Sequence, residues 1–239
     1  MNTTHKLTTL KYWSLLTLLS LFLFSPAYVL AQKTFEGVVH YKIDTQGNGP
    51  NSFTYYAKDK KARIEMQMPS QSPMGNAAFI IDGDSKSMIT LIPQMKMYMQ
   101  MSMPDADTTD YGDVSDEQKP VKVGDSETIL GHKCDHWRIN DEDGSTVDLW
   151  NAKDFGNFMM AGNMGGMPGG RKQPEWMKDF MSQGFFPLKV IVTNKNGNKE
   201  MTMEATKVEE KTLSSSLFEV PSGYNKMNMP NMGNMGRQN

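Results

Sequence analysis

Apolar and polar residues alternate along Phe35-Glu-Gly-Val-Val-His-Tyr-Lys-Ile43, the segment from which the fold class can be argued. In an extended strand, successive side chains point to opposite faces, so one set faces a core and the other faces solvent. The first set is Phe35, Val39, Tyr41 and Ile43, and the second is Glu36, His40 and Lys42. We therefore expect a half-buried β-strand here.

The same period-2 pattern recurs between turn signals along most of the chain. Asp82-Gly-Asp84 and Asn196-Gly197 are the clearest turns, because these residue pairs tolerate the positive φ that tight hairpins need. Hairpin connections in place of crossover helices predict a mainly β protein, built as a single curved antiparallel sheet or open half-barrel. Further strands are expected at 52–57, 62–68, 77–81, 88–92, 96–103, 121–130, 133–139, 146–150, 187–194 and 198–209.

One helix is expected in the C-terminal half of the chain, at 174–183. Pro174 suits a first helical turn, Trp176 and Phe180 are spaced i,i+4, and Gly184 stands where a C-terminal cap belongs. We expect this helix to cover one face or mouth of the sheet.

Residues 1–31 have the features of a secretory signal peptide. Lys6 and Lys11 give a positive start, 13–24 is an apolar stretch, and Val29 and Ala31 form a small-residue cleavage site. The apolar stretch is shorter than the ~20 residues that span a bilayer, so no membrane-spanning segment is expected after cleavage. The expected product is an exported bacterial protein, periplasmic or secreted.

The remainder divides into one β domain at 32–224 and a Met/Asn-rich tail at 225–239, which is expected to be disordered. The full chain has 239 residues, with 25 Lys and Arg against 27 Asp and Glu. This weak acidity argues against a nucleic-acid binder that tracks phosphates, which needs a basic face. The single cysteine excludes an intramolecular disulfide.

Three short segments, in this order, carry a resemblance to a known family. They are Phe35-Glu-Gly-Val-Val-His-Tyr, then Thr128-Ile-Leu-Gly-His-Lys-Cys-Asp-His-Trp-Arg-Ile139 with Val147-Asp-Leu-Trp150, then Leu217-Phe-Glu-Val-Pro-Ser-Gly-Tyr224. Together they resemble the DUF4412 family of exported bacterial proteins. That family is similar in outline to the LolA, LolB and LppX group. In that group a half-open β-barrel, capped by helices, holds acyl chains in an apolar cavity.

The resemblance covers nearly the whole chain after the signal peptide, and its motifs are turn and packing residues. It implies a LolA-like fold and a class of cavity, and it carries no catalytic signature. The sequence also lacks a Gly-x-Ser-x-Gly elbow, a His-Glu-x-x-His pair and a glycine loop for phosphates. We therefore expect a non-enzymatic protein without a cofactor.

Methionine is the compositional excess of this chain, with 22 residues. Thioethers on regular strands can line an adaptable apolar pocket, and they are also soft ligands for Cu(I) and Ag(I). The apolar interpretation is favoured, because the methionines alternate with polar residues in ordinary half-buried patterning. The expected cavity residues are Ile64, Met66, Met97, Met99 and Met101, with Trp176 and Phe180 from the covering helix.

A second candidate site is His132-x-Cys134-x-His136, whose side chains project from one face of a strand. A thiolate with two imidazoles suits copper or zinc. In the alternative interpretation, Cys134 is a small buried apolar residue and His136 is a surface partner of Asp135 or Glu142.

The leading hypothesis is an exported binding protein that holds an apolar or lipid-like ligand in a Met-lined cavity. One alternative is a periplasmic soft-metal binder that uses the Met-rich segments, and another is a structural domain that interacts with an envelope protein and holds no ligand.

Overall fold

The computed structural model describes residues 35–45, 51–67, 75–103, 119–159 and 184–227. These residues form strands joined by short turns, with three single-turn 3-10 helices. The helical turns are η2 (Pro93–Met95), η4 (Lys153–Phe155) and η5 (Ser215–Phe218). The strands are β1 (Gly37–Thr45), β2 (Ser52–Lys58), β3 (Lys61–Gln67), β4 (Ala77–Asp82), β5 (Ser87–Ile92), β6 (Met97–Ser102), β7 (Val121–Lys122), β8 (Glu127–Ile129), β9 (His132–Asn140), β10 (Thr146–Ala152), β11 (Pro187–Thr193), β12 (Lys199–Glu210) and β13 (Asn225–Lys226).

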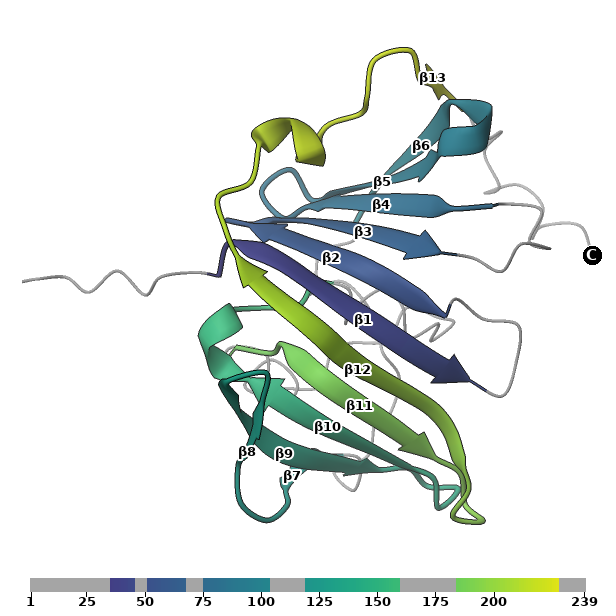
Figure 1. Ribbon diagram of the computed structural model, residues 1–239. Coiled ribbons are helices and arrows are strands. Elements are labelled where there is room, and N and C mark those ends of the chain that lie inside the picture. The colour runs from purple at the N-terminus through teal and green to yellow at the C-terminus, as the bar shows by residue number, and fades with distance from the viewer. Residues whose placement is uncertain (1–34, 46–50, 68–74, 104–118, 160–183, 228–239) are drawn as a thin grey trace, which may run out of the picture. The chain divides into compact units, whose positions relative to one another are not determined.

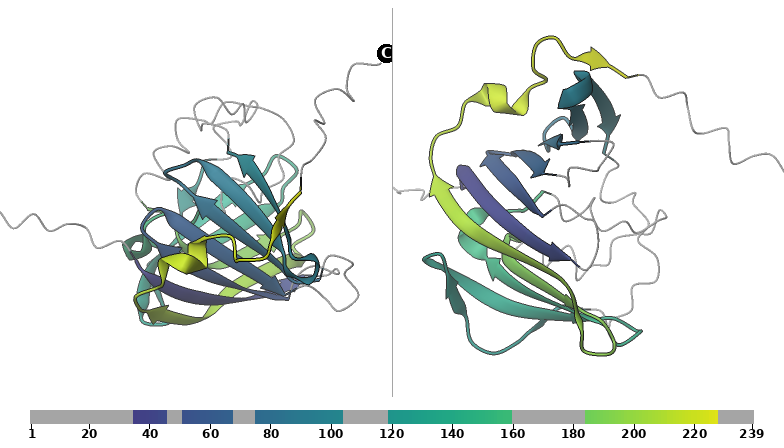
Figure 2. Two further views of the ribbon diagram at one scale, coloured as in Figure 1. Left: turned by 90° about the horizontal axis from the view of Figure 1, so that it is seen from above. Right: turned by 45° about the vertical axis from the view of Figure 1, so that its right-hand side comes forward.

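All of these strands belong to one sheet, in the order β13-β6-β5-β4-β3-β2-β1-β12-β11-β10-β9-β7, and β8 also pairs with β9. The early strand β1 and the late strand β12 are neighbours in its middle (Figure 1). The sheet is curved but open, since its edges at β13 and at β7 have no partner strand among the described residues (Figure 2). The predicted mainly β fold, a single curved antiparallel sheet that does not close, is therefore confirmed.

Turn chemistry explains several of the hairpins. The Asp82-Gly-Asp84 and Asn196-Gly197 signals lie at the β4–β5 and β11–β12 turns, as expected. The turn between β8 and β9 consists of Leu130 and Gly131, with φ of 50° and 86°. Positive φ at both residues is typical of the two-residue turn that matches the twist of paired strands.

The side of β1–β6 that carries Val39, Tyr41, Tyr55 and Ile64 is called the inner face, and it holds the main hydrophobic cluster. A segment between β10 and β11 adds aromatic rings to this cluster. Phe158 stacks on Tyr55 at 4.5 Å between ring centroids, and Phe186 meets Tyr55 edge-on at 5.4 Å. The apolar set of alternating residues that the sequence predicts along 35–43 therefore faces the larger core.

The opposite side, which carries Val38, His40 and Thr54, is called the outer face. Residues 211–227, here called the C-terminal strap, run over it from β12 to the β6 edge (Figure 1). The strap buries Leu213 and Phe218 in a second hydrophobic cluster. Its backbone is held by Lys58 Nζ, which donates to the Leu213 carbonyl at 2.7 Å, and by Arg63 Nη1, which donates to the Leu217 carbonyl at 3.1 Å.

Four sequence expectations need adjustment or lie outside the described residues. The strand expected at 121–130 is two short strands, β7 and β8, both paired with β9. The expected tail begins too early, because Asn225 and Lys226 form β13 in parallel with Met97 and Tyr98. The covering helix at 174–183 and the signal peptide at 1–31 lie outside the described residues.

Candidate functional site

The inner face is organised in cross-strand rows that run from β2 to β6. Directly paired residues of neighbouring antiparallel strands project from the same face, so the register defines each row. The rows begin at aromatic or small residues near the middle of the sheet and end at methionines on β6. One row is Tyr55, Ile64, Phe79, Thr90 and Met99, and the next is Ala57, Ala62, Ile81, Met88 and Met101.

Five of the seven residues expected to line a cavity lie on this face, and their exposure rises toward β6. Ile64 and Met66 are buried in the main cluster. Met97 and Met99 are half-buried, and Met101 is 40% exposed. Trp176 and Phe180, the other two expected residues, lie outside the described residues.

The aromatic end of the inner face is filled by the protein itself. Tyr41 and Tyr55 are almost fully buried, and burial raises the pKa of both phenols well above its usual range. Each hydroxyl has a partner: Tyr41 donates to the Pro187 carbonyl at 2.9 Å, and Tyr55 accepts from the Met159 backbone N–H at 3.1 Å. This end is thus a satisfied core, and the less filled part of the face is the methionine end.

The proposed histidine and cysteine ligands do not form a metal site in the structure. Among the described residues, no group of three or more His, Cys, Asp or Glu side chains is placed to hold a metal ion. Cys134 is fully buried, and burial raises the pKa of its thiol to about 11, which disfavours the thiolate a metal needs. His132 packs edge-on against Phe155 at 4.6 Å.

His136 belongs to a polar cluster that the sequence did not predict. Its Nε2 lies 2.8 Å from Asp148 Oδ1, and Arg138 donates to both oxygens of the same carboxylate, at 2.8 and 3.1 Å. The His136 ring also stacks on Trp150 at 4.3 Å, and Lys189 Nζ lies 4.6 Å from the centroid of the same indole. Because these residues come from β9, β10 and β11, we interpret the cluster as a clamp between three strands.

Asp135 forms a second buried polar centre, on the opposite face of β9 from His136. Its carboxylate accepts a hydrogen bond from Ser126 at 2.7 Å and pairs with Lys122 at 3.0 Å and Lys153 at 3.1 Å. The Ser126 hydroxyl and the two ammonium groups hold the pKa of Asp135 well below its usual range. A lowered pKa means that the carboxylate stabilises the folded state above its unfolded-state pKa and loses that contribution as the pH falls.

We expect Asp135→Asn to lower the free energy of unfolding by about 1–3 kcal/mol at neutral pH, as for a hydrogen-bonded buried charge. The difference from the original chain should shrink below about pH 4, where the unfolded-state carboxyl protonates. Urea unfolding at a series of pH values measures this. Asp154→Asn, at an exposed position on η4, is the control and should show no such pH-dependent difference.

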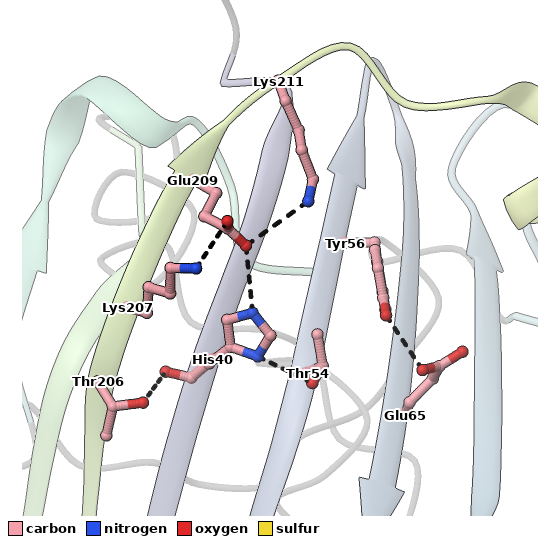
Figure 3. A network of polar contacts seen from close by, with 8 residues as sticks. All are labelled: His40, Thr54, Tyr56, Glu65, Thr206, Lys207, Glu209 and Lys211. Carbon is pink, nitrogen blue, oxygen red and sulfur yellow. Dashed lines mark hydrogen bonds and ion pairs between the residues drawn. The ribbon is translucent and has the colours of Figure 1, made fainter.

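The outer face beside β1 and β12 carries a solvated network (Figure 3). His40 Nε2 lies 3.4 Å from Glu209, and Lys207 and Lys211 approach the same carboxylate at 2.8 and 3.5 Å. Lys207 and His40 lower the pKa of Glu209 to about 2. Every group of this network already has a partner, so we interpret it as a polar surface of the sheet and not as a reactive centre.

A family model described as "Domain of unknown function (DUF4412)" matches residues 35–224. No curated protein matches the sequence. In the described residues, no helix has the length and apolar character required to cross a membrane.

Several solved structures are similar at low identity. The structure of PNGF-II is 14% identical with a TM-score of 0.46, and the match covers 82% of this chain and 31% of that chain. A chain of the MucA/MucB complex of Pseudomonas aeruginosa is 10% identical with a TM-score of 0.43, and the match covers 79% of this chain and 56% of that chain. A putative outer membrane lipoprotein-sorting protein domain from Vibrio parahaemolyticus is 10% identical with a TM-score of 0.32, and the match covers 76% of this chain and 88% of that chain. This chain thus spans less than two thirds of the length of the first two of these chains.

Proposed function

We propose that this chain, which belongs to the DUF4412 family, is an exported, non-enzymatic binding protein that holds an apolar, lipid-like ligand on its inner face. The observation that carries the proposal is the gradient along the cross-strand rows. Buried residues such as Ile64 are continuous with Met97, Met99 and the 40% exposed Met101. The ligand would lie along β6 and extend the main hydrophobic cluster.

A wall of methionines suits a ligand whose shape varies. The unbranched thioether side chain has three rotatable bonds and fills irregular gaps, so it adapts to a flexible acyl chain. Each buried methylene of such a chain contributes about 0.8 kcal/mol. The aromatic end of the same face is already filled by Phe158 and Phe186, so binding is expected at the β6 end only.

The test compares two substitutions of neighbouring exposed residues on opposite faces of β6. Met101 lies on the inner face opposite Met88, whereas Ser102 faces the other way. We expect Met101→Lys to weaken binding of a fluorescent long-chain fatty acid by about tenfold or more, because the ammonium must be desolvated against the ligand. Ser102→Lys adds the same charge and should bind as the original chain does.

Equal binding by both variants, or no binding by the original chain, would reject the proposal. The second outcome would favour a domain that contacts an envelope protein and holds no apolar ligand.

A further inference from the structure

Four methionines gather at one end of the inner face, next to the β4–β5 turn and the end of β6. Met88 on β5 is paired directly with Met101 on β6. Met103 continues the inner-face alternation of β6, and its backbone N–H donates to the Lys86 carbonyl at 2.8 Å. Met159 comes from a different part of the chain, after η4, and packs against the main hydrophobic cluster, as Met88 and Met103 do.

The Met159 side chain lies beside the β4–β5 turn. A Cβ placed on Gly83 would lie only 3.1 Å from the Met159 methyl carbon, so the glycine leaves room for that thioether beside the turn. Lys86, the partner of Met103, belongs to the same turn. Three separate elements therefore bring Met88, Met101, Met103 and Met159 to one place.

The exposure of these side chains differs from that of core methionines. Met66 is 6% exposed and serves as packing, whereas Met101 is 40% exposed and the other three are half-buried. An ion could reach this group from solvent while the cluster behind it restrains the side chains. Residues opposite each other on paired strands have Cβ atoms about 4.5–5.5 Å apart, which long flexible side chains can bridge.

The donor set selects the kind of ion. Thioethers are neutral, soft ligands that favour Cu(I) and chemically similar Ag(I) over Mg²⁺, Ca²⁺ or other hard cations. Harder ions prefer imidazole and carboxylate groups, and no cluster of three such side chains is present among the described residues.

We propose that Met88, Met101, Met103 and Met159 form a thioether site for a soft monovalent metal ion, Cu(I) or Ag(I). The site goes beyond the proposed lipid-like ligand and does not depend on it. Its ligands lie at the end of the inner face that is next to the β4–β5 turn, whereas Met97 and Ile92 lie at the other end of β6 and β5, next to η2.

The experiment uses the full chain, Ag(I) as a redox-stable probe, and substitutions that keep the surface apolar. Met88→Leu/Met103→Leu removes two proposed ligands, and Met201→Leu/Met203→Leu removes two methionines from β12 as the matched control. We expect native mass spectrometry and titration to show one tight Ag(I) equivalent in the original chain and in the control. The test variant should lose affinity by about tenfold or more.

Methyl NMR of the methionines identifies the ligands directly, since the methyl signals of the four proposed residues should shift together with the first equivalent of Ag(I). Shifts confined to other methionines, or equal losses of affinity in the two double variants, would overturn the site. Should the test variant be too unstable to compare, Met101→Leu at an exposed position gives the second test and should also weaken Ag(I) binding. Fatty-acid binding is measured separately on the original chain, so failure of the metal site and failure of the lipid-like proposal are distinguishable.

Discussion

Phe186→Ala is expected to lower the free energy of unfolding by about 3–5 kcal/mol, the usual cost of removing a fully buried aromatic side chain. Phe186 has no exposed surface. Its ring contacts Phe35, Phe155 and Phe158, with centroids at 5.9, 4.9 and 5.2 Å. The substitution leaves a cavity where β1, η4 and the segment before β11 meet, and the surrounding rings can close it only in part.

The adjacent Phe185→Ala is the matched control, because Phe185 is half-buried at the margin of the same cluster. It should cost less than half as much as Phe186→Ala in urea unfolding. The backbone bonds of Phe186 with Asn151 and Ala152 do not involve the ring, so both variants retain them. Similar losses in the two variants would show that the aromatic packing is not centred on Phe186.

Ending the chain after Thr212 is expected to destabilise the protein by several kcal/mol and to promote aggregation. The truncation removes Leu213 and Phe218, which are 6% and 5% exposed, from the second hydrophobic cluster. Each buried side chain of this kind contributes about 1.5–3 kcal/mol. The truncation also uncovers Ile80 and Leu91 on the outer face and frees the β6 edge, a template for pairing with another chain.

A chain that ends after Met227 keeps the whole strap and is the control for this truncation. Urea unfolding and light scattering should find it close to the full-length protein in stability and solubility. If the chain ending at Thr212 matched it in both, the strap would have no structural role.

The sequence predicted the fold class because the relevant signals are local. Alternation along 35–43 and the Asn196-Gly197 turn each depend on a few neighbouring residues, and both appear in the structure at the expected places. The inner-face positions of Ile64, Met66 and Met99 follow from the same alternation. What alternation does not contain is the order of strands in the sheet, such as the pairing of β1 with β12.

The features that the sequence did not predict depend on contacts between distant segments. In the alternative interpretation His136 is a partner of Asp135 or Glu142, whereas in the structure the register of β9 and β10 brings it to Asp148. The pairing of β13 with β6 cannot be predicted locally either, because Asn225 and Lys226 have weak strand preference. This segment is held by the backbone N–H groups of Asn225 and Met227, which donate to the carbonyls of Lys96 and Tyr98. The gathering of Met159 with Met88 and Met103 also arises only in the folded chain.

Native mass spectrometry of the protein purified from its own cells, without detergent, tests the central claim most directly. If the inner face holds a lipid-like ligand, the spectrum should contain a species heavier than the bare chain, which releases an apolar molecule of acyl-chain type on activation. Met101→Lys should greatly reduce that species, and Ser102→Lys should retain it. A spectrum that contains only the bare chain, together with no uptake of added fatty acid, would contradict the claim.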